Sequence, residues 1–98
     1  GEEPRTAAIR ELEEECGLAA DEVIDLHPVY PSVGYDTEVI HMYLATGLHE
    51  TKCHPDEDEF LDRLSYPLDT LVEMVMQGEI CDAKTVAGIL KAKIRLGK

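Results

Sequence analysis

Apolar side chains in the first part of the chain recur at helical spacing. At about 100° per residue, four of them fall on one arc of a helix: Ala8, Ile9, Leu12 and Cys16. Pro4 suits the first turn of such a helix, and Gly17 stands where a left-handed residue would end it. The pattern therefore predicts a helix from Pro4 to Cys16.

Two stretches in the middle of the chain have the character of strands. Glu22–Tyr30 is rich in Val, Ile and Leu and breaks near Pro28, while Glu38–Ala45 is apolar on both alternating faces. The second stretch suits a strand that is covered by helices on both sides. Leu48–Glu59 has the polar composition of a loop, and Phe60–Tyr66 is a candidate short strand after it.

The last third of the chain predicts two more helices, with a break at Gly78 between them. Apolar positions at helical spacing mark the first helix: Leu68, Leu71, Val72, Val75 and Met76. A second set marks the other helix: Ala83, Val86, Ala87, Leu90 and Ile94. Helices that flank strands indicate an α/β fold, and residues 1–98 suffice for a single domain.

Composition and charge narrow the classes of function. With 44% hydrophobic residues the chain can bury a small core, and its net charge of −12 disfavours binding to a nucleic acid. No apolar run approaches the roughly 20 residues of a membrane-spanning helix. The three cysteines form no C-x-x-C pair, and reduced thiols fit the cytoplasm. We therefore expect a soluble cytoplasmic protein with neither nucleic-acid nor membrane partners.

Three carboxylates are spaced so that they can converge on one side of the first helix: Glu11, Glu14 and Glu15. Two full charges about 4 Å apart near a protein surface repel by about 4 kcal/mol, and a hard cation reverses the sign. Mg²⁺ suits such a site, because it accepts one or two carboxylates and completes its shell with waters and substrate phosphates. The alternative is a Glu-rich face that is simply solvated.

A longer string encloses these carboxylates. It consists of Glu2, seven residues, Arg10-Glu11, an aliphatic residue, any residue, Glu14-Glu15, any residue, Gly17 and an aliphatic residue. This string resembles the Nudix box of the Nudix hydrolases, which opens with a glycine six positions before its first glutamate. The resemblance implies a Nudix fold, an α-β-α sandwich with a mixed sheet. It also implies that the chain is the carboxyl-terminal part of that domain, with the amino-terminal strands missing.

The resemblance also implies roles within the box. Glu11 and Glu15 would bind the catalytic divalent metals, Mg²⁺ or Mn²⁺, with Glu14 as a further ligand or a near neighbour. The structural positions of the box are Glu2, Arg10 and Gly17. Of these, Glu2 and Arg10 would pair to brace the loop and the helix, because the planar guanidinium can hold a carboxylate.

A second segment carries a resemblance to one branch of this family. Residues 31–38, Pro-Ser-Val-Gly-Tyr-Asp-Thr-Glu, are similar to the Ser-Pro-Gly loop and following glutamate of the ADP-ribose pyrophosphatases. This implies substrate-loop roles for Ser32, Gly34 and Glu38. Val33 replaces the proline usual in that branch, which weakens the preference for ADP-ribose over other nucleoside diphosphate derivatives. The alternative is an ordinary turn, with Gly34 supplying backbone freedom.

Pyrophosphate hydrolysis needs a base to take a proton from water and cations to neutralise the developing charge. The resemblance places a catalytic glutamate in the loop after the strand that ends near Gly47, and there it falls on Glu57. Glu59 is a second candidate or a metal contact, and Glu15 would contribute to catalysis through the metal. The alternative is that the acidic run Asp56–Glu59 is only a solvated loop.

Together these features predict a metal-dependent enzyme whose partner is a small nucleotide substrate. The expected reaction is hydrolysis of ADP-ribose or a related nucleoside diphosphate derivative, giving AMP and ribose 5-phosphate from ADP-ribose. The full-length protein is expected to be a homodimer. The alternative is that this chain, as it stands, is a noncatalytic fragment or an interaction module that lacks the amino-terminal substrate-binding part. An acidic calcium-binding protein finds little support, because the chain contains no D-x-[DN]-x-[DN]-G loop.

Overall fold

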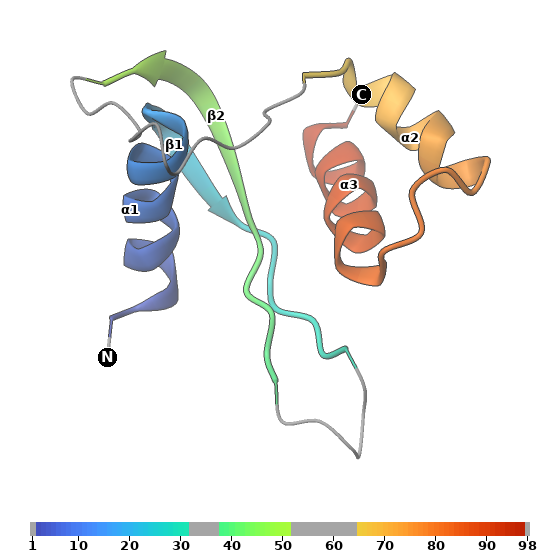
Figure 1. The fold of residues 1–98 in the computed structure, drawn as a ribbon, viewed down its shortest axis with the longest axis horizontal. Helices are drawn as coiled ribbons and strands as arrows, with labels where there is room; N and C mark the ends of the chain where they lie inside the picture. The colour runs from blue at the N-terminus through green and yellow to red at the C-terminus, as the bar shows by residue number, and fades with distance from the viewer. Residues whose placement is uncertain (1, 32–37, 52–64, 98) are drawn as a thin grey trace. The chain divides into compact units, whose positions relative to one another are not determined.

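The computed structural model describes residues 2–31, 38–51 and 65–97. These residues fall into two compact units. The first unit holds residues 2–25 and 43–51, and the second holds residues 26–31, 38–42 and 65–97. Figure 1 shows the elements of both units in chain order.

The first unit begins with the helix α1, Pro4–Cys16. A proline stands in its first turn, where the missing N–H costs no helical hydrogen bond. Gly17 ends the helix in the left-handed conformation, with φ 68°, and its N–H donates to the carbonyl oxygen of Glu13 at 2.9 Å. The predicted helix and both of its ends are therefore confirmed.

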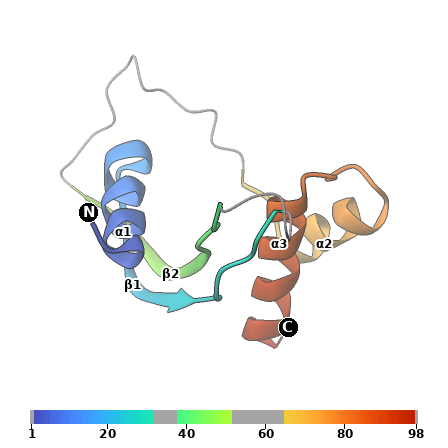
Figure 2. The ribbon, with the colours of Figure 1, turned by 90° about the horizontal axis from the view of Figure 1, so that it is seen from below.

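Two antiparallel strands complete the described part of the first unit. β1 spans Leu18–Asp25 and β2 spans Tyr43–Glu50. The register pairs the first residue of β1 with the last residue of β2, so the strands are matched along their whole length. The helix α1 packs against β1, as Figure 2 shows. A small apolar cavity of about 130 Å³ lies in this unit, lined by Ala8, Ile9, Leu12, Val23, Tyr43 and Ala45.

The strands lie where the sequence predicted strands, but their limits were wrong. β1 begins four residues before the predicted start at Glu22 and ends at Asp25, because His27 adopts a left-handed φ of 70° that leaves the extended region. β2 begins at Tyr43 rather than Glu38 and takes in Leu48–Glu50, which had been expected to form a loop. Of the predicted strand Phe60–Tyr66, only the last two residues are described, and they are not in a strand.

The second unit contains an arm made of two short segments, residues 26–31 and 38–42. The Leu26 N–H donates to the Met42 carbonyl oxygen at 2.9 Å, and Val29 and Ile40 exchange two backbone hydrogen bonds of 2.9 Å. Leu26 and Met42 are the buried hydrophobic residues of the described chain, each 9% exposed. The backbone bonds and these two side chains hold the segments of the arm together.

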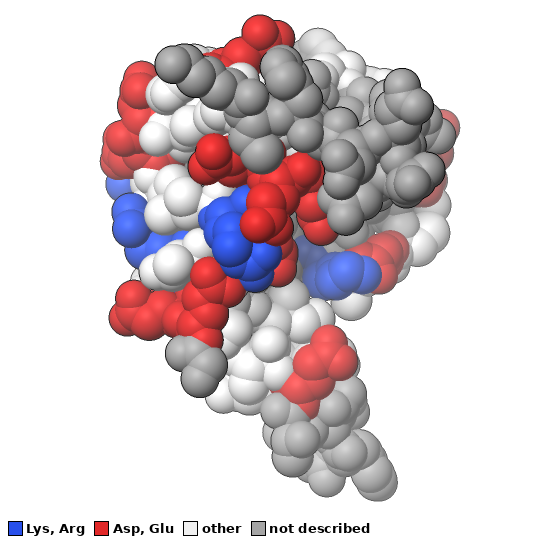
Figure 3. Space-filling view, turned by 60° about the vertical axis from the view of Figure 1, so that its left-hand side comes forward, with Lys and Arg blue, Asp and Glu red and all other residues white. Residues whose placement is uncertain are grey.

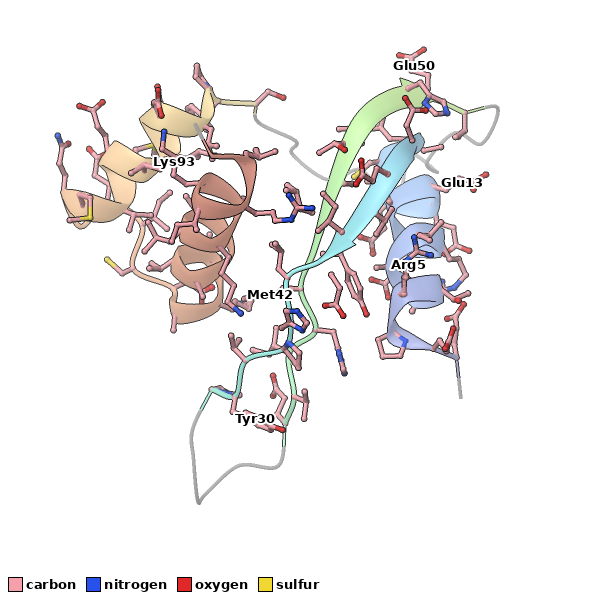
Figure 4. The ribbon with its side chains drawn as sticks, turned by 180° about the vertical axis from the view of Figure 1, so that it is seen from behind. Arg5, Glu13, Tyr30, Met42, Glu50 and Lys93 are labelled. Carbon is pink, nitrogen blue, oxygen red and sulfur yellow. The ribbon has the colours of Figure 1, made fainter. Side chains whose placement is uncertain are left out.

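Two helices pack together in the same unit: α2, Leu68–Met76, and α3, Ala83–Leu96. Both were predicted. The Lys93 ammonium group of α3 reaches the Asp69 carboxylate of α2 at 2.7 Å (Figure 4). This contact lowers the pKa of Asp69, first through the hydrogen bond and then through the lysine's charge.

Four positions of the predicted apolar faces are exposed: Ile9, Met76, Ala83 and Ile94. Met76 is 74% exposed and Ile94 is 81% exposed, although helical spacing assigned both to buried faces. Met76 and Ile94 stand at or near the carboxyl-terminal ends of their helices. Within the described residues, no helix combines the length and the apolar character that crossing a bilayer requires.

The backbone at Gly47 generates a prediction about stability. Gly47 has φ +67°, and a Cβ built there would lie 2.5 Å from Oδ2 and 2.7 Å from Cβ of Asp21. Gly78 has φ +82°, but a Cβ built there meets nothing within 4 Å. We expect Gly78→Ala to destabilise the full-length protein by about 1 kcal/mol through backbone strain alone, and Gly47→Ala by about 2–4 kcal/mol because a clash is added. Urea unfolding of both variants measures the difference, and equal losses would refute the close approach of Asp21.

Candidate functional site

The acidic face of α1 gathers the carboxylates that the sequence singled out. Glu11, Glu14 and Glu15 all lie on α1, and all three side chains are exposed. Glu11 and Glu15 are four residues apart, so they are neighbours on the helix surface, one turn from each other. The helix therefore presents them to solvent, where a diffusing cation and an anionic substrate can reach them.

Arg10 organises this face. Its Nε and Nη2 atoms donate to the Glu2 carboxylate at 2.9–3.1 Å, in a two-pronged contact that suits a planar guanidinium. Its Nη1 atom donates to Glu14 Oε2 at 2.8 Å. The hydrogen bond from Arg10 is the main cause that lowers the pKa of Glu2, and the same contact is the main cause that raises the pKa of Arg10.

The carboxylates of the face are thus divided into two kinds. Glu2 and Glu14 accept hydrogen bonds from Arg10, whereas Glu11 makes a longer ion pair, with 3.9 Å between Glu11 Oε1 and Arg10 Nη2. Within residues 2–31, 38–51 and 65–97, no hydrogen bond or ion pair engages the Glu15 side chain. Figure 3 shows acidic side chains bordering the basic ones on one face of the molecule.

The donor set that remains fits a hard cation with an incomplete protein shell. Among the described residues, no group of three or more His, Cys, Asp or Glu side chains is placed to hold a metal ion. Two exposed carboxylates remain one helical turn apart. Among the described residues Glu15 has no partner, and Glu11 makes only an ion pair of 3.9 Å with Arg10. Two carboxylates suit Mg²⁺, which takes one or two carboxylates and fills its other positions with waters and phosphate oxygens.

Several predicted site residues lie outside the described residues. These are Glu57 and Glu59, the two candidates for the base, and Ser32 and Gly34 of the expected substrate loop. Glu38, the last residue of that loop, is described and exposed. It belongs to the second unit, where it lines a cavity of about 400 Å³ with the arm and the start of α3.

That cavity has walls of mixed chemistry. Tyr30, Pro31 and Ile40 contribute from the arm, and Asp82, Ala83, Lys84 and Ala87 contribute from α3 and its cap. The Asp82 carboxylate accepts hydrogen bonds from the backbone and the hydroxyl of Thr85 and from Lys84. The hydroxyl of Thr85 is the main cause that lowers the pKa of Asp82.

Sequence reasoning missed some residues that shape these surfaces. The spacing of Asp82 and Thr85, Asp-x-x-Thr, is typical of a helix N-cap, so the sequence could have predicted this contact. The spacing of Arg10 and Glu14 is a favourable helical pair, and it too had a signal. No sequence pattern predicts the contact of Lys91, because its partners are the backbone carbonyls of Leu26 and His27, more than sixty residues away.

Comparisons with known proteins bear on this site. The family described as "NUDIX domain" matches residues 1–87. The chain is 40% identical over 91 residues to the ADP-ribose pyrophosphatase of Bacillus subtilis (strain 168), and equally to the methanol dehydrogenase activator of Bacillus methanolicus. Each match covers 91% of this chain and 49% of the relative. A GDP-mannose pyrophosphatase of Escherichia coli O1:K1 / APEC is 35% identical over 88 residues, covering 87% of this chain and 46% of that protein.

A solved structure agrees with these sequence matches. The crystal structure of an ADP compounds hydrolase has a TM-score of 0.82 and 25% identity with this chain. The match covers 99% of this chain and 52% of the other. The chain therefore spans about half the length of the relatives that it matches.

The pairing of Glu2 with Arg10 generates a prediction about pH. The pKa of Glu2 is lowered from its ordinary value of 4.5, so the folded state binds a proton less readily than the unfolded state. The stabilisation from this pair is therefore fully present above pH 4.5 and is lost as the pH falls through the lower folded pKa. We expect the stability difference between wild type and Arg10→Gln to shrink over that range in urea unfolding of the full-length protein.

Arg5→Gln serves as the control for this experiment. Arg5 Nη2 approaches the Val23 carbonyl oxygen at 3.5 Å, and a carbonyl does not titrate. The loss caused by Arg5→Gln should therefore not change with pH between about 3 and 7. An Arg10→Gln difference that is equally constant would contradict the pairing.

Proposed function

Because the chain belongs to the Nudix family, we propose that the complete protein hydrolyses the pyrophosphate bond of ADP-ribose or of a related nucleoside diphosphate derivative. The relatives named ADP-ribose pyrophosphatase and GDP-mannose pyrophosphatase support this substrate class. With ADP-ribose the products are AMP and ribose 5-phosphate. Val33 in place of the usual proline supports testing more than one sugar nucleotide.

The observation that carries this proposal is the way Arg10 divides the carboxylates of α1. Arg10 hydrogen-bonds to Glu2 and Glu14 but makes only a 3.9 Å ion pair with Glu11, so Glu11 and Glu15, one helical turn apart, keep carboxylate oxygens that a cation can bind. A face of carboxylates that were only solvated would not require some of them to be paired with Arg10 and others to be left accessible. We therefore assign Glu11 and Glu15 as ligands of Mg²⁺ or Mn²⁺, and Glu14 as their neighbour.

The reaction requires the oxygen of a water molecule to bond to one phosphorus while the bond from that phosphorus to the bridging oxygen breaks. The water gives up a proton, and we assign Glu57 to accept it, with Glu59 as the second candidate. The divalent ion, when bound, polarises the phosphate oxygens and offsets their negative charge. Glu15 and Glu11 would hold the ion at the surface of α1, and the contact between Glu2 and Arg10 braces the start of the helix.

The net charge of the whole sequence supports a cation-dependent reaction. A net charge of −12 repels a diphosphate, so an anionic substrate needs compensating charge at the site. Homodimer formation and a cytoplasmic location of the complete protein stay predictions.

Substitution of Glu15 tests the proposed site. We expect Glu15→Gln in the full-length protein to lower kcat for ADP-ribose with Mg²⁺ by about 100- to 1000-fold, because a ligand charge is lost where transition-state charge develops. Glu13→Gln is the matched control, since Glu13 is exposed on the same helix and Figure 4 shows it projecting from α1. Its kcat should stay within about twofold of wild type. Unchanged turnover in Glu15→Gln would remove the proposed metal site.

The second candidate function is that these 98 residues alone form a noncatalytic unit. It is favoured by one observation, namely that the chain spans about half of its relatives. The same assay on this chain and on the full-length protein separates the two candidates. Turnover by both would reject the noncatalytic alternative, and turnover by the longer protein alone would support it.

A further inference from the structure

Lys91 makes an unusual contact in the second unit. Its ammonium group donates to the carbonyl oxygen of Leu26 at 2.9 Å and to that of His27 at 3.1 Å. Lys91 is half-buried on α3, so the charge is partly shielded from water. One lysine thus joins α3 to two successive backbone carbonyls of the arm.

The backbone at this point is constrained. His27 has φ 70°, a left-handed conformation that non-glycine residues rarely adopt. Pro28 follows, and a residue before proline is also disfavoured in the right-handed helical region. The strain at His27 persists only if surrounding contacts hold it, and Lys91 supplies two of them.

The contact lies next to the cavity that Glu38 lines. Ala87 lines the same cavity from α3, and Lys91 follows it by four residues, which places both on one face of the helix. The other wall is the arm, in which Val29 and Ile40 pair by two backbone hydrogen bonds. Lys91 therefore connects the two walls, and the spacing between them depends on it.

We propose that Lys91 is a positioning residue for substrate binding, because it fixes the arm against α3 and thereby places Glu38. The inference rests on the proposed function and on the substrate-loop role that the resemblance to the ADP-ribose pyrophosphatases implies for Glu38. Lys91 does not touch the reacting atoms in this account. Its effect travels through the backbone of Leu26 and His27 to the paired segments of the arm, and from Ile40 to Glu38 two residues before it.

The kinetic test uses the full-length protein with ADP-ribose and Mg²⁺. We expect Lys91→Met to raise KM by about 3- to 10-fold while kcat stays within about twofold, because placement of a binding group is lost and the chemistry is not. Lys91→Arg should recover most of the wild-type KM, since a guanidinium can also donate to two carbonyls. Figure 4 shows the matched control, Lys93, on the same helix. Lys93→Met breaks the ion pair to Asp69 and should leave KM unchanged.

Amide hydrogen exchange gives a readout that does not depend on turnover. Lys91→Met should speed exchange at the amides of Val29 and Ile40, and Lys93→Met should not. Unchanged KM and unchanged exchange in Lys91→Met would overturn the inference. Equal changes in KM for Lys91→Met and Lys93→Met would also overturn it, because they would show a general loss of packing. If the wild-type protein turns over neither ADP-ribose nor GDP-mannose, the proposed function itself fails. That result can be told apart from the two variant outcomes that would overturn the inference about Lys91.

Discussion

The candidate site depends on the hydrogen bonds that the Arg10 guanidinium makes. The guanidinium holds Glu2 before α1 and Glu14 within α1 at the same time, so it ties the chain that enters the helix to the helix surface. In a chain with nine Lys and Arg against twenty-one Asp and Glu, a cation with two carboxylate partners has a large local effect. Its single charge offsets only part of the charge of these acids, so the face of α1 that includes Glu11 and Glu15 keeps an excess of negative charge.

The other described cations are also engaged within the protein. Lys84 pairs with the cap residue Asp82, Lys93 pairs with Asp69, and Lys91 donates to the arm. Arg95 apart, every Lys and Arg of residues 2–31, 38–51 and 65–97 donates to a carboxylate or carbonyl of its own unit. Among the described residues only Arg95 is then left to meet an anionic ligand, which supports the proposal that a bound cation rather than a cluster of lysines balances the charge of a diphosphate.

Local signals explain which parts of the fold could be predicted from the sequence. The limits of α1 follow from a proline at one end and a glycine at the other, and α2 and α3 follow from apolar spacing. The limits of β1 and β2 depend on their mutual register and on the left-handed His27. A short window of sequence predicts neither feature. The partner of a strand lies far along the chain, and a left-handed conformation is expected at glycine rather than at histidine.

The same distinction applies to the candidate site. The bidentate contact of Arg10 with Glu2 could be predicted from a motif of fixed spacing. The hydrogen bonds from Lys91 to two backbone carbonyls correspond to no sequence motif. Every residue has a backbone carbonyl, so the sequence does not predict which carbonyl accepts a hydrogen bond from a lysine. The choice is made by the arm, which turns at His27 and presents the carbonyls of Leu26 and His27 to one ammonium group. The candidate site residues and the Glu2–Arg10 pair could therefore be predicted from the sequence, while the contact of Lys91 with the arm becomes visible only in the folded backbone.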